Sequence, residues 1–180
     1  MSNAMHGEVL DFWFAAENQP RWFVRDPAFD ASVVERLGHL HERAAAGELE
    51  SWGDDPRGAL ALVILLDQVP RNAFRGQARA FASDPHARAI TSRALDLDLD
   101  RALTEVERVF LYLPLEHSES LADQERCCAL MAALSAPIWL DFAERHRAII
   151  ARFGRFPHRN AALGRASTAE EIAFLAEPGS

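Results

Sequence analysis

Four short polar segments interrupt an otherwise apolar sequence, and they contain the side chains best suited to chemistry. The first runs from Asp67 to Arg75 and directly follows the apolar run 59–66. A carboxylate next to so apolar a segment is expected to be at least partly buried, and a buried charge needs partners. Arg71 and Arg75 are the local candidates, with Asn72 between them. Either an Asp–Arg pair fixes this segment, or the arginines face a ligand.

The second segment follows Pro114, which is expected to break or kink the helix that contains it. Glu116, His117 and Glu119 then fall within one turn, near the predicted start of the next helix, and Gln124 follows about a turn later. Histidine with a carboxylate can ligate a divalent metal or act as an acid–base pair. Alternatively, the carboxylates simply favour a helix N-terminus.

The third element is His146, which shares a helical stripe with apolar side chains. The stripe consists of Trp139, Phe142, Ile149, Ile150 and Phe153. This spacing predicts that His146 faces inward. It is either a hydrogen-bonded core histidine or a site residue that faces the segment from Glu116 to Glu119.

The fourth segment, 152–160, alternates basic and aromatic side chains. Its polar members are Arg152, Arg155, His158, Arg159 and Asn160. Guanidinium groups held by aromatic rings suit a carboxylate or a phosphate. The alternative is that these arginines pair with the acidic residues of the other segments.

Composition excludes several classes of protein. The net charge of −8 argues against binding nucleic acid, although all 19 basic residues are arginine. The longest apolar run, 59–66, is far too short to span a membrane, and no signal peptide is apparent, which predicts a cytoplasmic protein. The adjacent Cys127 and Cys128 resemble core residues of a reducing compartment. Because the chain lacks a glycine-rich phosphate loop and zinc-ligand spacing, we expect neither cofactor nor metal.

The elements that must position these side chains are all predicted to be helices. Residues 1–4 resemble an expression tag, and residues 5–180 are expected to form a single all-α domain. Capping residues and apolar periodicity predict antiparallel helix pairs packed around the helix that contains 59–66. The helices are expected near 6–16, 28–46, 57–68, 85–95, 104–113, 119–134, 137–152 and 168–176.

Motifs in these segments resemble a known bacterial family. They are Asp67 to Asn72 with Phe74 to Gly76, Tyr112 to Glu119 with Asp123 and Gln124, Arg152 to Asn160, and Leu10 to Phe14 with Trp22 and Phe23. The sequence is similar to members of domain of unknown function 924. The resemblance implies an all-helical fold like that of tetratricopeptide repeats, and it implies no established activity, cofactor or partner.

Three functions remain open from the sequence. In the first, the chain binds an anionic small molecule or peptide through Asp67, Arg71, Asn72, Arg75, Gln124, Arg152, Arg155, His158, Arg159 and Asn160. In the second, it is a hydrolase or lyase in which Glu116, His117, Glu119 and His146 do acid–base or metal chemistry. In the third, the polar residues form a structural ion network in an interaction domain. A homodimer is a further assembly that the sequence allows.

Overall fold

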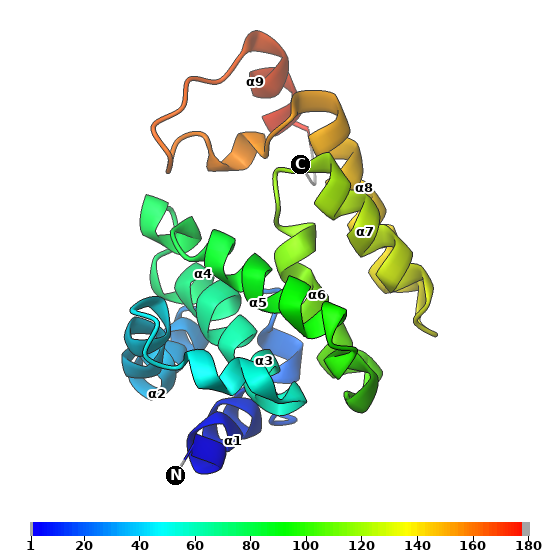
Figure 1. Cartoon of the computed structure of the whole chain (residues 1–180). Helices are drawn as coiled ribbons and strands as arrows, with labels where there is room; N and C mark the ends of the chain where they lie inside the picture. The colour runs from blue at the N-terminus through cyan, green and yellow to red at the C-terminus, as the bar shows by residue number, and fades with distance from the viewer. Residues whose placement is uncertain (1, 178–180) are drawn as a thin grey trace. The chain divides into compact units, whose positions relative to one another are not determined.

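Helix-forming segments separated by Pro, Gly and capping residues produce an entirely helical chain. The computed structural model describes residues 2–177, and within them there is no β-strand, as predicted (Figure 1). The helices are α1 (Ser2–Trp13), α2 (Pro27–Ala45), α3 (Pro56–Val63), α4 (Val69–Ala73), α5 (Asp84–Asp96), α6 (Glu105–Glu116), α7 (Leu121–Ala132), α8 (Pro137–Phe153) and α9 (Ala169–Leu175). None of the described helices is long and apolar enough to cross a membrane.

The chain divides into two compact units. The first unit comprises the residues up to Arg75 together with Arg79–Pro114, and the second comprises Gly76–Ala78 and the residues from Leu115 onward. The boundary falls inside α6, which continues through Pro114 to Glu116. The helix expected near 104–113 therefore extends past Pro114, which does not break it. A proline in a helix removes one hydrogen bond, and here the helix tolerates that loss.

The first unit is packed around α3, as the apolar run predicted. Residues 59–66 are completely buried, and α1 and α5 both pack against α3. Three aromatic side chains pack together in this core. The ring centroid of Trp13 lies 5.9 Å from that of Phe29 and 5.8 Å from that of Phe110. The absence of polar side chains from residues 59–66 thus reflects their position among neighbouring helices.

Helical structure does not end at the last residue of α3 but continues in a wider turn. Ile64–Gln68 form a π-helical turn, η3, in which the N–H of Val69 donates to the carbonyl of Ile64. Pro70 has no N–H, so it cannot donate to the carbonyls of the preceding turn. Side chains serve two of them: His41 Nδ1 lies 2.8 Å from the Leu65 oxygen, and Ser83 Oγ donates to the Leu66 oxygen at 2.5 Å. Helical structure then continues in α4.

The helix starts follow the sequence signals with two shifts of one residue. Asp26, Asp55 and Asp84 each precede a proline, which predicts a capping aspartate at all three positions. Asp26 and Asp55 do cap α2 and α3, where their side chains accept two and one backbone N–H groups. At α5, however, the capping position is Ser83, and Asp84 is the first helical residue. The capping box of α9 is formed by Thr168 and Glu171, whereas the pattern of Ser167 and Glu170 predicts it one residue earlier.

The second unit contains the helical hairpin of α7 and α8, which pack side by side (Figure 1). Its interior includes Cys127, Met131, Ala143 and Ile150. The predicted stripe of α8 was wrong at Phe142, which is 41% exposed. The buried residues of α8 are instead the neighbouring Ala143 and, two turns later, Ile150.

Candidate functional site

In the first unit, Arg71 holds two carboxylates. Its two Nη atoms donate to the two oxygens of Asp84 at 2.9 and 3.0 Å. Its Nη1 also lies 3.1 Å from Asp67 Oδ1 and donates to the Asp67 backbone oxygen at 2.6 Å. Asp67 is fully buried and accepts a further hydrogen bond from Gln68 at 2.6 Å. Burial acts to lower the pKa of Arg71, but Asp67 and Asp84 raise it above its usual value. Helical structure continues beyond Asp67 into α4, so its carboxylate does not lie at a helix end.

Arg75 pairs with a carboxylate from another helix rather than with Asp67. Its Nε and Nη2 donate to the two oxygens of Asp30, on α2, at 2.6 and 2.7 Å. Asn72 donates to the same carboxylate at 2.8 Å. Burial acts to raise the pKa of Asp30, but the hydrogen bonds from Arg75 and Asn72 lower it. Asn72 on α4 and Arg75 just after it thus connect this part of the chain to α2, so the segment 67–75 is fixed by carboxylates of its own unit.

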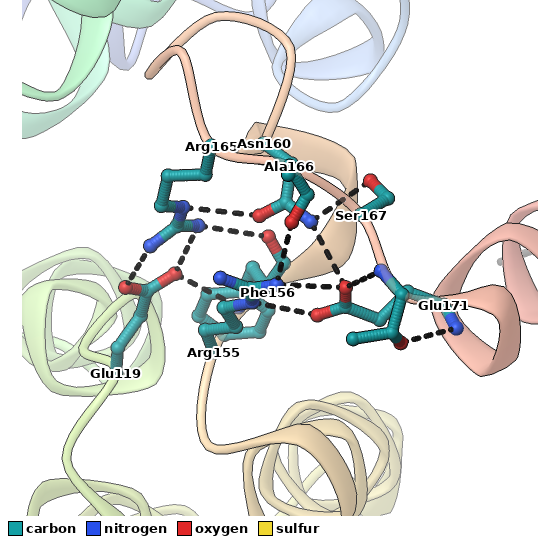
Figure 2. Close-up of polar contacts among 9 residues, drawn as sticks. Glu119, Arg155, Phe156, Asn160, Arg165, Ala166, Ser167 and Glu171 are labelled. Atoms are coloured by element: carbon teal, nitrogen blue, oxygen red, sulfur yellow. Dashed lines mark hydrogen bonds and ion pairs between the residues drawn. The ribbon is translucent and has the colours of Figure 1, made fainter.

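In the second unit, Glu119 belongs to a polar network that includes Arg165 and Phe156 (Figure 2). Its two oxygens accept from Arg165 at 2.7 and 2.9 Å, and Oε1 also accepts from the backbone N–H of Phe156 at 2.8 Å. Arg165 donates in addition to Asn160 Oδ1 at 3.0 Å. Burial acts to raise the pKa of Glu119, but the hydrogen bonds from Arg165 and Phe156 lower it. Arg165 could not be predicted from the sequence, since it lies in a segment without helical periodicity or any recognised motif.

A second ion pair extends the network toward α9. Arg155 donates to both oxygens of Glu171 at 2.6 and 2.8 Å, and Asn160 donates to Ser167 and Glu171 at 3.0 and 3.3 Å (Figure 2). The hydrogen bonds from Arg155 and from the Thr168 N–H lower the pKa of Glu171 to about 2. The network therefore holds the segment that follows α8 against the start of α9.

Three other polar residues of the second unit, Gln124, Arg152 and His158, have contacts apart from the network of Glu119 and Arg165. Gln124 is fully buried, and its Nε2 donates to the backbone oxygens of Glu116 and Ser118 at 2.5 and 2.8 Å. It thereby satisfies carbonyls at the end of α6. Arg152 is exposed and pairs with Glu170 at 2.8 Å. His158 is also exposed, with its ring centroid 5.5 Å from that of Phe156.

The most chemically suggestive pair in this unit is Glu116 and His146. Glu116, the last residue of α6, is only 4% exposed, and its Oε1 lies 3.2 Å from Nδ1 of His146 on α8. The same Nδ1 lies 2.9 Å from the backbone oxygen of Phe142. Both neighbours are hydrogen-bond acceptors, so the proton of a neutral His146 ring belongs on Nδ1. In that tautomer Nε2 is the basic nitrogen.

Aromatic and cationic groups surround this pair. The His146 ring centroid lies 6.4 Å from that of His117 and 5.6 Å from that of Phe156. Arg159 is 6% exposed, lies over the Phe156 ring at 4.5 Å and donates to the backbone oxygen of His117 at 2.9 Å. The structure thus brings Glu116, His117 and His146 together, whereas Glu119 belongs to the Arg165 network. Among the described side chains, no group of three or more His, Cys, Asp or Glu could hold a metal ion.

The chain is similar to known proteins over nearly its whole length. The model of a bacterial family described as proteins of unknown function, DUF924, matches residues 9–179. The chain belongs to the DUF924 family. This DUF924 protein also resembles a solved structure of a protein of unknown function, ATU0120 from Agrobacterium tumefaciens, at 43% sequence identity and a TM-score of 0.93. The similarity covers 98% of this chain and 99% of the other. No curated protein is significantly similar to this chain.

The family relationship confirms the resemblance found in the sequence and supplies no activity. The description of the family and the name of the solved relative both state that the function is unknown. Any role for this DUF924 protein must therefore be argued from its own side chains.

Proposed function

We propose that the protein is an enzyme that uses the Glu116–His146 pair for acid–base chemistry. In this proposal His146 Nε2 removes a proton from water or from the substrate, and Glu116 holds the ring and stabilises its protonated form. The observation that carries the proposal is the position of His146 Nδ1 between two acceptors, the Glu116 carboxylate at 3.2 Å and the Phe142 oxygen at 2.9 Å. A base oriented by a third group is the recurring arrangement in hydrolases and related enzymes.

Arg159 supports an anionic substrate for this chemistry. Its guanidinium is fixed by the Phe156 ring and by the His117 carbonyl, which places a fixed positive charge near the segment that ends in Glu116. Fixed cations stabilise negative charge that develops in a transition state. The proposed reaction is therefore a hydrolysis or elimination on a small molecule that carries a carboxylate or phosphate.

The other predicted ligand-binding arginines fit a structural role better. Arg71, Arg75 and Arg155 each donate to both oxygens of a carboxylate of the chain. An anionic ligand would have to displace such a two-point contact. In this proposal these arginines fix the helices.

Three predictions from the sequence stay predictions: the tetratricopeptide-like arrangement, the cytoplasmic location and a homodimer.

The proposal is tested with a panel of p-nitrophenyl esters and phosphates as probe substrates. A general base contributes about 10²–10⁴-fold to a rate, so the variant His146→Gln is expected to lose activity by that factor. Glu116→Gln should lose less, because the Phe142 carbonyl still orients the ring. Glu170→Gln is the matched control, since it neutralises an exposed carboxylate in the same unit. Turnover that persists in His146→Gln would contradict the proposal.

A further inference from the structure

Two adjoining hollows in the first unit share the residues His41 and Glu42 of α2. One, of about 330 Å³, has a mostly apolar lining that includes Val34, Gly38 and Phe74. The other, of about 270 Å³, lies between α2 and the start of α5. Hollows of this size accommodate a small molecule. The sequence analysis did not select these residues, because they belong to no recognised motif.

His41, which lines both hollows, has a hydrogen-bond acceptor on its ring. The residue is 4% exposed, and its Nδ1 lies 2.8 Å from the carbonyl oxygen of Leu65 in the π-helical turn. Since a carbonyl can only accept, the Nδ1 atom carries the proton of the neutral ring and Nε2 has a lone pair. Within residues 2–177, Nε2 has no hydrogen-bond partner.

The chain already places a cation of its own at this position. Arg79 pairs with Glu42, and its guanidinium lies 4.0 Å from the centroid of the Phe74 ring. An aromatic face and a carboxylate together are favourable surroundings for a cation. The side chains of Arg79 and Glu42 are 53% and 56% exposed, so their pair is weak and the arginine can be displaced.

We propose that the two adjoining hollows together bind a small organic amine with an apolar body. The ammonium group takes the place of the Arg79 guanidinium beside Glu42 and the Phe74 ring, and it donates a hydrogen bond to His41 Nε2. The apolar body lies against Val34 and Gly38. Arg79 then acts as a built-in competitor for the ligand. This site is separate from the proposed Glu116–His146 chemistry, which belongs to the other unit.

The lining disfavours two other ligands. An anion would meet the Glu42 carboxylate and an acceptor nitrogen, and Arg79 is already neutralised by Glu42. A metal ion would need a set of three or more ligands, and the described side chains contain none.

The test uses benzylamine as the probe, with benzyl alcohol and phenylacetate as neutral and anionic analogues of similar size. Binding is followed by NMR titration of the backbone amides of Gly38 and Phe74. Benzylamine is expected to bind more tightly than either analogue. Arg79→Ala removes the competing cation and should tighten benzylamine binding by about twofold to tenfold. Arg57→Ala, which breaks another exposed ion pair in the same unit, is the control and should leave binding unchanged.

Two further variants block the site itself. His41→Asn keeps a donor for the Leu65 carbonyl but lacks the Nε2 acceptor, and it should weaken binding by about tenfold or more. Gly38→Leu fills the hollow, and a Cβ at Gly38 meets only Val34, at 3.8 Å, so the backbone need not shift. Gly7→Leu is its control, because a Cβ there meets nothing within 4 Å. The proposal is overturned if phenylacetate binds as tightly as benzylamine, if Arg79→Ala fails to tighten binding, or if Gly38→Leu binds as the wild type does.

Discussion

Replacement of Glu119 by alanine should destabilise the second unit more than the removal of any exposed ion pair. Glu119 serves three donors, the two Nη atoms of Arg165 and the backbone N–H of Phe156. Phe156 is completely buried, so its N–H cannot donate to water in place of the carboxylate once Glu119 is replaced.

The size of the effect follows from these contacts. Leaving a buried N–H without its acceptor costs about 1–3 kcal/mol. The Arg165–Glu119 pair is 24% and 28% exposed at its side chains, and solvent screening limits its contribution to about 0.5–1 kcal/mol. The sum is about 1.5–4 kcal/mol, and since about 1.4 kcal/mol is tenfold in an equilibrium constant, hydrogen exchange at Phe156 should accelerate by roughly 10- to 1000-fold.

The assay is amide hydrogen exchange of Phe156, together with urea denaturation followed by circular dichroism. Arg152→Gln is the matched control, because its pair with Glu170 has side chains 49% and 62% exposed. That variant should change the free energy of unfolding by less than about 1 kcal/mol. The reasoning is refuted if Glu119→Ala alters neither the Phe156 exchange rate nor the unfolding free energy beyond the control.

Three other perturbations are expected to have measurable effects. Leu62→Ala should reduce the free energy of unfolding by about 2–5 kcal/mol in urea melts, because Leu62 is fully buried; a loss below 1 kcal/mol would argue against a central α3. Ser83→Ala leaves the Leu66 carbonyl without its side-chain donor and should cost about 1–3 kcal/mol, whereas Ser32→Ala, with a half-buried hydroxyl, should cost less in the same melts. Glu171 has a pKa lowered to about 2, so it stabilises the fold above its unfolded pKa of about 4.5 and that contribution is lost as the pH falls toward 2. The melting temperature of Glu171→Gln should therefore fall less steeply than that of the wild type as the pH is lowered from 4.5 to 2. Parallel profiles of melting temperature against pH would contradict this.

The helices could be predicted because their signals are local. Asp26 and Asp55 precede prolines at helix starts, and the apolar run 59–66 required cover on every side. The π-helical turn at Ile64–Gln68 was not predicted, since it depends on donors from His41 and Ser83 that are distant in sequence.

The polar partners were predicted less well because ion pairing is decided by tertiary structure. Asp67 with Arg71, four residues apart on one helical segment, could be inferred from spacing alone. The partner of Arg75 is Asp30, 45 positions away, and the partner of Glu119 is Arg165, 46 positions away. No periodicity indicates such pairs. The division of the chain near Pro114 was not predicted either, and α6 continues across it.

The central claim, that Glu116 and the Phe142 carbonyl orient His146 as a base, is tested most directly by ring-nitrogen NMR. Selectively ¹⁵N-labelled histidine and long-range ¹H–¹⁵N correlation show which nitrogen of the neutral His146 ring carries the proton, with the exposed His158 as an internal comparison. We expect the proton on Nδ1 and a lone pair on Nε2. A proton on Nε2 of the neutral His146 ring would contradict the account.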